Sequence, residues 1–540
     1  MPQTSPISCT PVPATTLRQW LNDGHEIALL DVREAGQFGE GHPFFAVPAP
    51  YSRLELDVPH LVPRRATRTV LLDAGDGVAA RAAQRLAALG YTDLHVLDGG
   101  APGWAAAGYT LFQGVNLPSK TFGELVEHAY ATPHISAAEL QARQASGQPL
   151  VLLDGRTFAE HRKVTIPGAT SVPNGELALR WHALAPDPAT PIVIHCAGRT
   201  RSIIGAQILR SLGVPNPVVA LENGTQGWAL AGLPLEHGST RRAHSAPQAC
   251  AQDQAAAARL ADEADVQRLD AAQAQAWLDD AARTVHVLDV RSDEEFAAGT
   301  LAGARHAPGG QLLQATDQTI GVRNGRVLLL DGEAVRAPVV AAWLARLGYE
   351  TAVVEGGIRA SLRVPAANLL HDATPARIDT QALPAWVAAR QPLLLDLQDS
   401  RAHRRQHAQG ARWTIRSRLP ADAHAAGSTD NTVLLLASDA GIARLAVAEL
   451  AEAGWHDVHW ALAADWVAAG LPVAASPDTP ADADAIDYLL FVHDRHDGNL
   501  EAARRYLAWE TGLIAQCAPD ELAVFRLPQP APAAHGSRRA

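Results

Sequence analysis

Short apolar runs that end in an aspartate recur four times along the chain. Their closing residues are Asp31, Asp154, Asp289 and Asp396. A second apolar run follows each one, and its last position lies 41 or 42 residues after the aspartate. These last positions are Asp73, Cys196, Asp331 and Ala437. Short apolar runs bounded by turn-forming residues are typical of strands that are buried on both faces of a sheet.

The segment after each second run has the pattern of a helix. A glycine followed by a bulky or branched residue lies 17 positions beyond each second run, at Gly90, Gly213, Gly348 and Gly454. Glycine at such a place commonly ends a helix. A third apolar run comes next in every copy. The repeated order of strand, helix and strand predicts parallel sheets with crossover helices on their faces.

We therefore expect an α/β fold of four tandem modules, each a small parallel sheet flanked by helices, and then a C-terminal helical tail. The spacing places module 1 at residues 12–115, module 2 at 130–238, module 3 at 263–370, module 4 at 375–475 and the tail at 476–540. The alanine- and glutamine-rich stretch 244–261 is predicted to be a linker. In the tail we expect a helix at about residues 500–515. The His/Asp cluster at 493–497 before it favours a turn and helix cap over a metal site.

Composition narrows the class of protein. With 47% hydrophobic and 19% charged residues the chain is an ordinary globular one, and its net charge of −12 argues against a nucleic-acid partner. No signal-like leader and no apolar run of about 18 residues is found, so we expect no membrane partner and a cytoplasmic location. The four cysteines do not form a disulfide framework. The sequence contains no dinucleotide-binding fingerprint and no Cys-x-x-Cys pair. We therefore expect no cofactor and no bound metal. The oligomeric state stays open.

Cys196 is the strongest candidate for chemistry. It follows the apolar run 191–195 and precedes a helix. The small, basic loop between them consists of Ala197, Gly198, Arg199, Thr200, Arg201 and Ser202. Unpaired N–H groups and the dipole at a helix N-terminus favour anions, and with neighbouring arginines they favour a thiolate over a thiol. The loop predicts a thiolate nucleophile directed at an anionic substrate. Strand alternation places the side chain of His195 on the opposite face, where we expect a structural role.

Module 2 carries further motifs in a definite order. They are Asp154-Gly155-Arg156, Thr165-Ile166-Pro167-Gly168-Ala169, His195-Cys196 with its loop, and Glu222-Asn223-Gly224-Thr225-Gln226-Gly227-Trp228. This series resembles the rhodanese-like sulfurtransferase family, with its Asp-x-Arg motif, Pro-Gly-Ala turn, active-site cysteine loop and Gly-Gly-x-x-x-Trp-like ending. The resemblance extends over about residues 15–475, as four modules.

The resemblance implies a sulfurtransferase that carries sulfane sulfur as a persulfide on Cys196. The donor would be a small anion such as thiosulfate, a mercapto-acid or a persulfide, and the acceptor a thiol, a sulfur-accepting protein or cyanide. Residues 197–202 would bind the substrate, with Arg199 and Arg201 holding its charge and Ser202 or Thr200 donating a hydrogen bond. Asp154 and Arg156 would give structural support.

The same resemblance implies that modules 1, 3 and 4 are inactive. Asp73, Asp331 and Ala437 stand at the cysteine position, and neither a carboxylate nor an alanine forms a persulfide. The loops that follow Asp73 and Asp331 are also acidic, which would repel the anion that the Cys196 loop attracts.

Two other functions remain open at this stage. A chain with four modules and one active thiol could be a sulfur carrier or scaffold with little turnover of small donors. A cysteine-dependent phosphatase also uses His-Cys and a basic loop, but its Cys-x5-Arg motif needs an arginine six positions after the cysteine. That position is Ser202 here, whereas the arginines follow at three and five positions, so the loop favours sulfur oxyanions.

Overall fold

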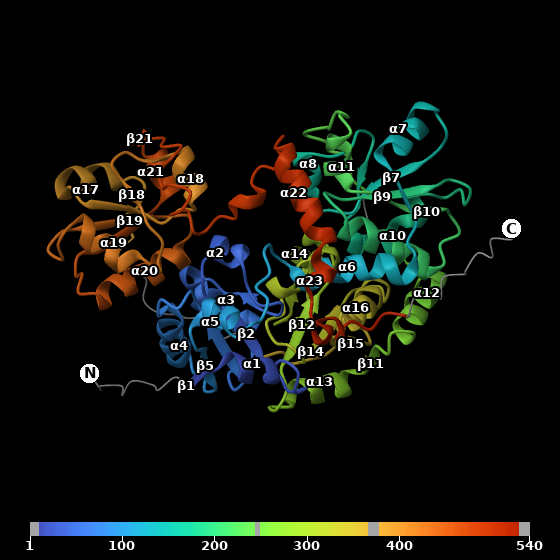
Figure 1. Ribbon diagram of the computed structural model, residues 1–540, viewed down its shortest axis with the longest axis horizontal. Helices are drawn as coiled ribbons and strands as arrows, with labels where there is room; N and C mark the ends of the chain where they lie inside the picture. Colours follow the sequence, from blue (N-terminus) through green and yellow to red (C-terminus); the bar gives the residue numbers. More distant parts are fainter. Residues whose placement is uncertain (1–9, 244–248, 366–376, 529–540) are drawn as a thin grey trace. The chain divides into compact units, whose positions relative to one another are not determined.

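The computed structural model describes residues 10–243, 249–365 and 377–528, which form two compact units (Figure 1). Unit 1 contains residues 10–21, 27–115 and 377–490, and so combines modules 1 and 4. Unit 2 contains residues 22–26, 116–243, 249–365 and 491–528, and so combines modules 2 and 3 with the tail helices. In the described part of the chain, no helix has the length and apolar character needed to cross a bilayer.

Modules 1, 2 and 3 contain five-stranded sheets of one topology. Module 1 has the strand order β1-β5-β4-β2-β3, and modules 2 and 3 repeat it as β6-β10-β9-β7-β8 and β11-β15-β14-β12-β13. All pairings in these sheets are parallel. The predicted α/β class with small parallel sheets is confirmed.

The strands of these three sheets are short, as expected for buried strands. In module 1 they are β1 Thr10–Val12, β2 Ala28–Asp31, β3 Val47–Pro48, β4 Thr69–Leu72 and β5 Leu94–Leu97. In module 2 they are β6 His134–Ile135, β7 Val151–Asp154, β8 Thr170–Ser171, β9 Ile192–His195 and β10 Val218–Leu221. In module 3 they are β11 Gln267–Leu269, β12 Val285–Asp289, β13 Arg305–His306, β14 Arg326–Leu330 and β15 Glu350–Val354.

Module 4 has the same plan, but its described residues contain no first edge strand. Its parallel sheet has the order β18-β16-β19-β20, and an isolated parallel bridge between Arg377 and Trp460 occupies the place of the missing edge. The strands are β16 Leu393–Asp396, β18 Arg412–Trp413, β19 Val433–Ala437 and β20 Val458–Leu462, with a separate antiparallel pair, β17 His407–Ala408 and β21 Val473–Ala474.

Helices cover both faces of the sheets. Those of unit 1 are α1 Ala14–Trp20, α2 Ala35–Glu40, α3 Leu54–Leu61, α4 Val78–Ala88, α5 Gly100–Ala106, α17 Leu383–Arg390, α18 Ser400–Arg405, α19 Leu419–Ala426, α20 Ala440–Glu452 and α21 Ala463–Ala468. In unit 2, α6 Leu117–Tyr130 precedes module 2, whose helices are α7 Ala137–Ala145, α8 Phe158–Lys163, α9 Leu177–Leu184, α10 Thr200–Leu212 and α11 Gly224–Leu230. The helix α12 Ala251–Asp262 precedes module 3, whose helices are α13 Ala271–Asp279, α14 Asp293–Ala298, α15 Gly309–Gln314 and α16 Arg336–Arg346. The tail adds α22 Leu500–Thr511, α23 Leu513–Gln516 and α24 Pro519–Leu522.

The helix that follows the second strand of each module matches its prediction. These helices are α4, α10, α16 and α20, and the glycine expected to end each one has a positive φ of 90, 79, 106 and 91° in chain order. Only glycine adopts this backbone conformation at little cost, so its place in the sequence indicated where each helix ends.

Modules 2 and 3 share one hydrophobic core. It contains Ile203 and Ile208 of α10, Leu312 of α15 and Trp343 of α16. All eleven residues of α16 are buried, because module 2 covers the face that a single module would leave to solvent. The two modules therefore fold as a pair, and unit 2 depends on contacts between them.

The predicted linker at 244–261 is wrong in its second half. Residues 251–262 form α12, which buries Ala257, Leu260 and Ala261 in the core of unit 2. The alanine-rich composition reflects helix propensity and close packing rather than flexibility. Residues 244–248 lie outside the described residues.

Candidate functional site

Cys196 lies between β9 and α10, at the carboxyl end of a central strand. β9 pairs with β7 on one side and with β10 on the other, and α10 begins four residues after the cysteine. The side chain of Cys196 is only 3% exposed. The hydroxyl of Ser202 donates a hydrogen bond to its Sγ at 3.1 Å. The sulfur is therefore covered, but it lies against a polar group.

The loop after Cys196 turns its carbonyl groups toward α11. The carbonyl of Cys196 accepts a hydrogen bond from the Thr225 N–H at 2.9 Å, and that of Ala197 accepts one from the Gln226 N–H at 3.0 Å. Gly224 permits this approach, because a Cβ there would lie 2.2 Å from the carbonyl oxygen of Cys196. With the carbonyls so engaged, the N–H groups of residues 197–201 find no acceptor among the described residues. Such a set of open N–H groups before a helix binds anions.

Carboxylates fill the corresponding positions in the other modules. Asp73 accepts hydrogen bonds from the N–H groups of Gly75 and Ala79, at 2.8 and 3.0 Å. Asp331 accepts three, from residues 334, 335 and 337, at 3.0, 2.9 and 2.9 Å. Burial, with Glu333 nearby, raises the pKa of Asp331 to about 6. In module 4 the carboxylate comes from Asp439, which accepts from the Ile442 N–H at 3.0 Å. These three loops supply their own anion.

Both arginines of the Cys196 loop are paired with carboxylates. Arg199 forms a two-pronged contact with Glu124 of α6, at 2.8 and 2.9 Å, and also contacts Glu127. Arg201 contacts Glu160 of α8 at 2.7 and 2.8 Å. Burial opposes the charge of each arginine, but these carboxylates raise the pKa of both guanidinium groups further. Donor binding by the two arginines stays a prediction, and their positive charges are balanced in this structure.

Asp154 and Arg156 form a buried ion pair beneath the loop. Arg156 donates to the two Asp154 oxygens at 2.8 and 2.7 Å, and to the carbonyl of Val164 at 2.5 Å. Modules 1 and 3 contain the same fork, between Asp31 and Arg33 and between Asp289 and Arg291. A contact that is present with and without the cysteine supports the fold rather than the chemistry.

His195 is buried in the central strand and stays neutral. Burial lowers its pKa to about 4, although the Asp154 carboxylate acts in the opposite direction. Its Nδ1 lies 3.3 Å from the carbonyl oxygen of Cys196. A buried imidazole bonded to the backbone matches the structural role that strand alternation predicts.

The tail helix α22 covers the Cys196 loop. A Cβ at Gly198 would lie 3.0 Å from Oε2 of Glu510 and 3.1 Å from Cε1 of Tyr506. The hydroxyl of Thr200 donates to Oε1 of Glu510 at 2.7 Å, and the ammonium of Lys120 donates to the same oxygen at 3.0 Å. Oε2 of Glu510 is buried without a hydrogen-bond partner among the described residues.

Lys120 and Glu510 thus form a buried ion pair beside the thiol. Burial opposes the charge of Lys120, but Glu510, then the Tyr506 hydroxyl and the Cys196 sulfur, raise its pKa. Burial also opposes the charge of Glu510, and Lys120 and Thr200 nonetheless lower its pKa. Both groups are ionised, so the cover over Cys196 is charged and hydrogen-bonded rather than a hydrocarbon lid.

Sequence reasoning missed Lys120, Glu124 and Glu510. No motif surrounds the first two, which lie in a segment between two predicted modules. The tail sequence gave no sign of the surface that it covers, whereas the structure places Tyr506 of α22 against Gly198.

One group among the described residues could offer ligands to a metal. Potential ligand atoms of His182, Cys250 and Asp253 lie within 4.8 Å of one another. Both Asp253 oxygens already have partners, since one lies 2.7 Å from the His182 ring and the other accepts hydrogen bonds from the backbone and thiol of Cys250. This group is explained by the N-terminal cap of α12.

Comparison with known proteins agrees with this geometry. A crystal structure of thiosulfate sulfurtransferase from Pseudomonas aeruginosa is 40% identical and superposes with a TM-score of 0.88, covering 97% of this chain and 100% of that one. The HTH-type transcriptional regulator Rv0324 of Mycobacterium tuberculosis is 36% identical over 107 residues, which are 19% of this chain and 45% of the length of that relative. The Rhodanese-like domain family matches residues 13–107, 136–231 and 270–362. Since these matches span more than half of the sequence, the chain belongs to the rhodanese-like domain family.

Proposed function

We propose that this protein transfers sulfane sulfur from a small anionic donor to a nucleophilic acceptor through a persulfide on Cys196. The observation that carries the proposal is the Cys196 loop, whose open N–H groups follow a sulfur that already accepts a hydrogen bond from Ser202. A persulfide anion on Cys196 carries the same charge as the thiolate and is longer by one sulfur atom. The likeness to a thiosulfate sulfurtransferase over the whole chain supports thiosulfate as the first donor to test.

The chemistry proceeds in two displacements. The Cys196 thiolate attacks the outer sulfur of thiosulfate, a new S–S bond forms, and sulfite leaves with the electron pair of the bond that breaks. The acceptor, cyanide or a thiolate, then attacks the outer sulfur of the persulfide. That step releases thiocyanate or a new persulfide and regenerates the Cys196 thiolate. No oxidant or reductant is consumed, and the loop N–H groups stabilise the anion at each stage.

Activity is confined to module 2 under this proposal. In modules 1 and 3 a carboxylate occupies the N–H groups of the loop, and in module 4 Ala437 stands at the cysteine position. A carboxylate of the protein that is bound to these N–H groups prevents a substrate anion from binding there. These modules then act as structural partners, as module 3 does for module 2 through their common core.

A sulfur carrier is the second candidate, and the burial of Cys196 favours it. A thiol that is 3% exposed beneath α22 reacts slowly with free small molecules unless the helix moves. A partner protein that displaces α22 would then deliver the sulfur, and turnover with free donors would be low.

Thiocyanate formation from thiosulfate and cyanide tests the proposal. We expect activity in the unmodified protein and in Cys250→Ser, which removes an exposed thiol at the start of α12, and none in Cys196→Ser. Intact-mass analysis after incubation with thiosulfate alone should show one added sulfur atom, which Cys196→Ser lacks. Persulfide without thiocyanate turnover favours the carrier, and equal activity in Cys196→Ser refutes both.

A further inference from the structure

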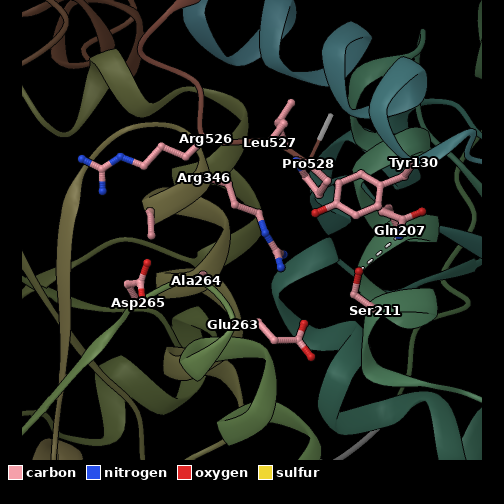
Figure 2. Close-up of a pocket in the computed structure, with 11 residues that line it drawn as sticks. Tyr130, Gln207, Ser211, Glu263, Ala264, Asp265, Arg346, Arg526, Leu527 and Pro528 are labelled. Carbon is pink, nitrogen blue, oxygen red and sulfur yellow. Dashed lines mark hydrogen bonds between the residues drawn. The ribbon is translucent and has the colours of Figure 1, made fainter. Parts of the chain in front are cut away.

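A cavity of about 650 Å³ lies within unit 2, between modules 2 and 3 (Figure 2). Its walls come from the end of α6, the middle of α10, the turn after α12, the end of α16 and residues 526–528. The volume falls within the ~300–1,000 Å³ that is usual for small-molecule sites. None of these residues takes part in the Cys196 site described above.

Arg346, the last residue of α16, provides a buried cation that forms no ion pair with a carboxylate of the described residues, although Glu263 lies near enough to favour its charge. Its side chain is 7% exposed, and Nη1 has no hydrogen-bond partner among the described residues. The guanidinium lies over two aromatic rings, with its central carbon 4.9 Å from the ring centre of Trp343 and 5.9 Å from that of Tyr130. Figure 2 shows it pointing into the open space between Tyr130, Ser211 and Glu263.

An arginine at the other end of the same helix has its charge balanced by carboxylates. Arg336, the first residue of α16, is 1% exposed and contacts the carboxylates of Glu176, Glu295 and Glu333 at 2.6 to 2.8 Å. Burial opposes the charge of Arg336, but those carboxylates raise its pKa. Burial lowers the pKa of Arg346, and Tyr130 and Glu263 offset this effect only in part. A buried charge without a partner destabilises a fold. An anion entering the cavity would supply the partner that Arg346 lacks.

We infer that this cavity is a binding site for a small organic monocarboxylate, which Arg346 holds through its guanidinium. The planar fork of arginine matches a carboxylate and binds it through two parallel hydrogen bonds.

The remaining walls define the class of ligand more closely. The ring of Tyr130, Leu527 and Pro528 offer apolar surface for a short or flat organic body. Gln207 and Ser211, which are hydrogen-bonded to each other at 3.2 Å, offer polar atoms on another wall. The carboxylates of Glu263 and Asp265 also line the cavity, so a dianion such as phosphate would be repelled more strongly than a monocarboxylate.

Benzoate is a suitable probe because it combines one carboxylate with a flat apolar body. Ligand-observed NMR with the full-length protein should show saturation transfer to benzoate at millimolar concentration. Arg346→Met should weaken this binding at least tenfold, and Arg346→Lys, which keeps the charge without the fork, should weaken it less. Equimolar inorganic phosphate should not compete. No transfer to benzoate, equal transfer with Arg346→Met, or displacement by phosphate would each overturn the inference.

Stability without ligand separates a binding residue from a structural one. Since Arg346 forms no ion pair with a carboxylate of the described residues, Arg346→Met should melt at the same temperature as the unmodified protein or higher, whereas Arg336→Met should melt lower. Benzoate should raise the melting temperature of the unmodified protein only. If Arg346→Met loses as much stability as Arg336→Met, Arg346 supports the fold and the site assignment is wrong. Thiocyanate formation is measured in parallel, and a loss there alone would bear on the sulfur-transfer proposal instead.

Discussion

At the scale of single residues, the sequence did not predict which carboxylates balance the positive charges around Cys196. The Gly-Arg-Thr-Arg run predicted a positive loop, and the motif placed Cys196 at the end of β9 as expected. The partners of Arg199 and Arg201 come from α6 and α8, and Glu510 comes from more than 300 residues along the chain. Such pairs arise from tertiary packing, and no local pattern encodes them.

Glu510 should weaken the binding of anionic donors. Its ionised carboxylate lies against Gly198 and Thr200, next to the open N–H groups. Glu510→Gln keeps the size and the oxygen that accepts from Thr200 and Lys120, but it removes the negative charge and leaves the charge of Lys120 unbalanced. We expect the KM for thiosulfate to fall roughly tenfold, which corresponds to about 1.4 kcal/mol.

Glu501→Gln is the matched control for that experiment. Glu501 lies on the same helix, is 79% exposed and forms an ion pair with Arg505. Its replacement should leave KM unchanged. An unchanged or raised KM in Glu510→Gln would show that the donor does not approach this carboxylate.

His286 should make unit 2 sensitive to acid. This β12 residue is buried, and neither ring nitrogen has a hydrogen-bond partner within the described residues. Burial, with Arg305 adding to it, lowers its pKa to about 3. The unfolded chain takes up the proton below about pH 6.5 and the folded chain does not, so stability is full above that pH and is lost toward pH 3.

His286→Leu should remove this part of the acid sensitivity. Denaturant unfolding near pH 7 and near pH 5 measures it, and the difference between the two values should shrink in His286→Leu. The exposed His456 provides the control, since His456→Leu should leave that difference as it is. An undiminished difference in His286→Leu means that other groups dominate the acid response.

At the scale of elements, the sequence predicted the repeated strands and helices but not the elements between modules. Each strand is a short apolar run and each helix after a second strand ends at a glycine. Both patterns span only a few consecutive residues, so they can be recognised in the sequence without knowledge of the tertiary structure. The segment that forms α6 contains Pro118 and Gly123, which weaken its helical pattern. It folds as a helix because α10 and α22 pack on it, and it then brings Lys120 and Glu124 to the site.

The helix α22 should control how fast reagents reach Cys196. Tyr506 anchors this helix to module 2, because its ring is buried next to Gly198. The ring centre lies 5.4 Å from the Lys120 ammonium and 4.1 Å from the Arg495 guanidinium. Tyr506→Ala leaves a cavity under the helix and loosens the cover. We expect alkylation of Cys196 by iodoacetamide to become about tenfold faster. Mass spectrometry of the peptide that contains Cys196 measures the rate. The solvent-facing change Arg505→Ala should leave the rate unaltered, and equal rates in all three proteins would mean that α22 does not limit access.

At the scale of the whole molecule, four modules with related parallel sheets have diverged in what fills the loop after the second strand. In module 2 the loop is open to an external anion, and in modules 1 and 3 an aspartate closes it. The sequence showed this division through the residue at one aligned position. What it did not show is the pairing of modules 1 with 4 and 2 with 3, because the contacts that join them are buried side chains far apart in the chain.

A buried charge network joins modules 1 and 4 within unit 1. Arg416 of module 4 is 1% exposed and contacts Glu55 of module 1 at 2.5 Å and Glu449 at 3.2 Å, with its guanidinium over the ring of Tyr51. Arg416→Met leaves Glu55 buried without its main counter-ion, while Arg85 still reaches Glu449 at 3.0 Å. We expect a loss of about 3 kcal/mol, the lower end of the range for breaking a buried pair.

Calorimetry of the full-length protein measures that loss, with the exposed Arg444→Met as the control on the same module. Cys196 belongs to unit 2, so thiocyanate formation at 25 °C should be the same in both variants and in the unmodified protein. A stability loss together with intact activity would assign modules 1 and 4 a structural role that is separate from the chemistry. If activity falls with the melting temperature still above the assay temperature, unit 1 contributes directly to sulfur transfer, and the modules without cysteine would need a functional explanation.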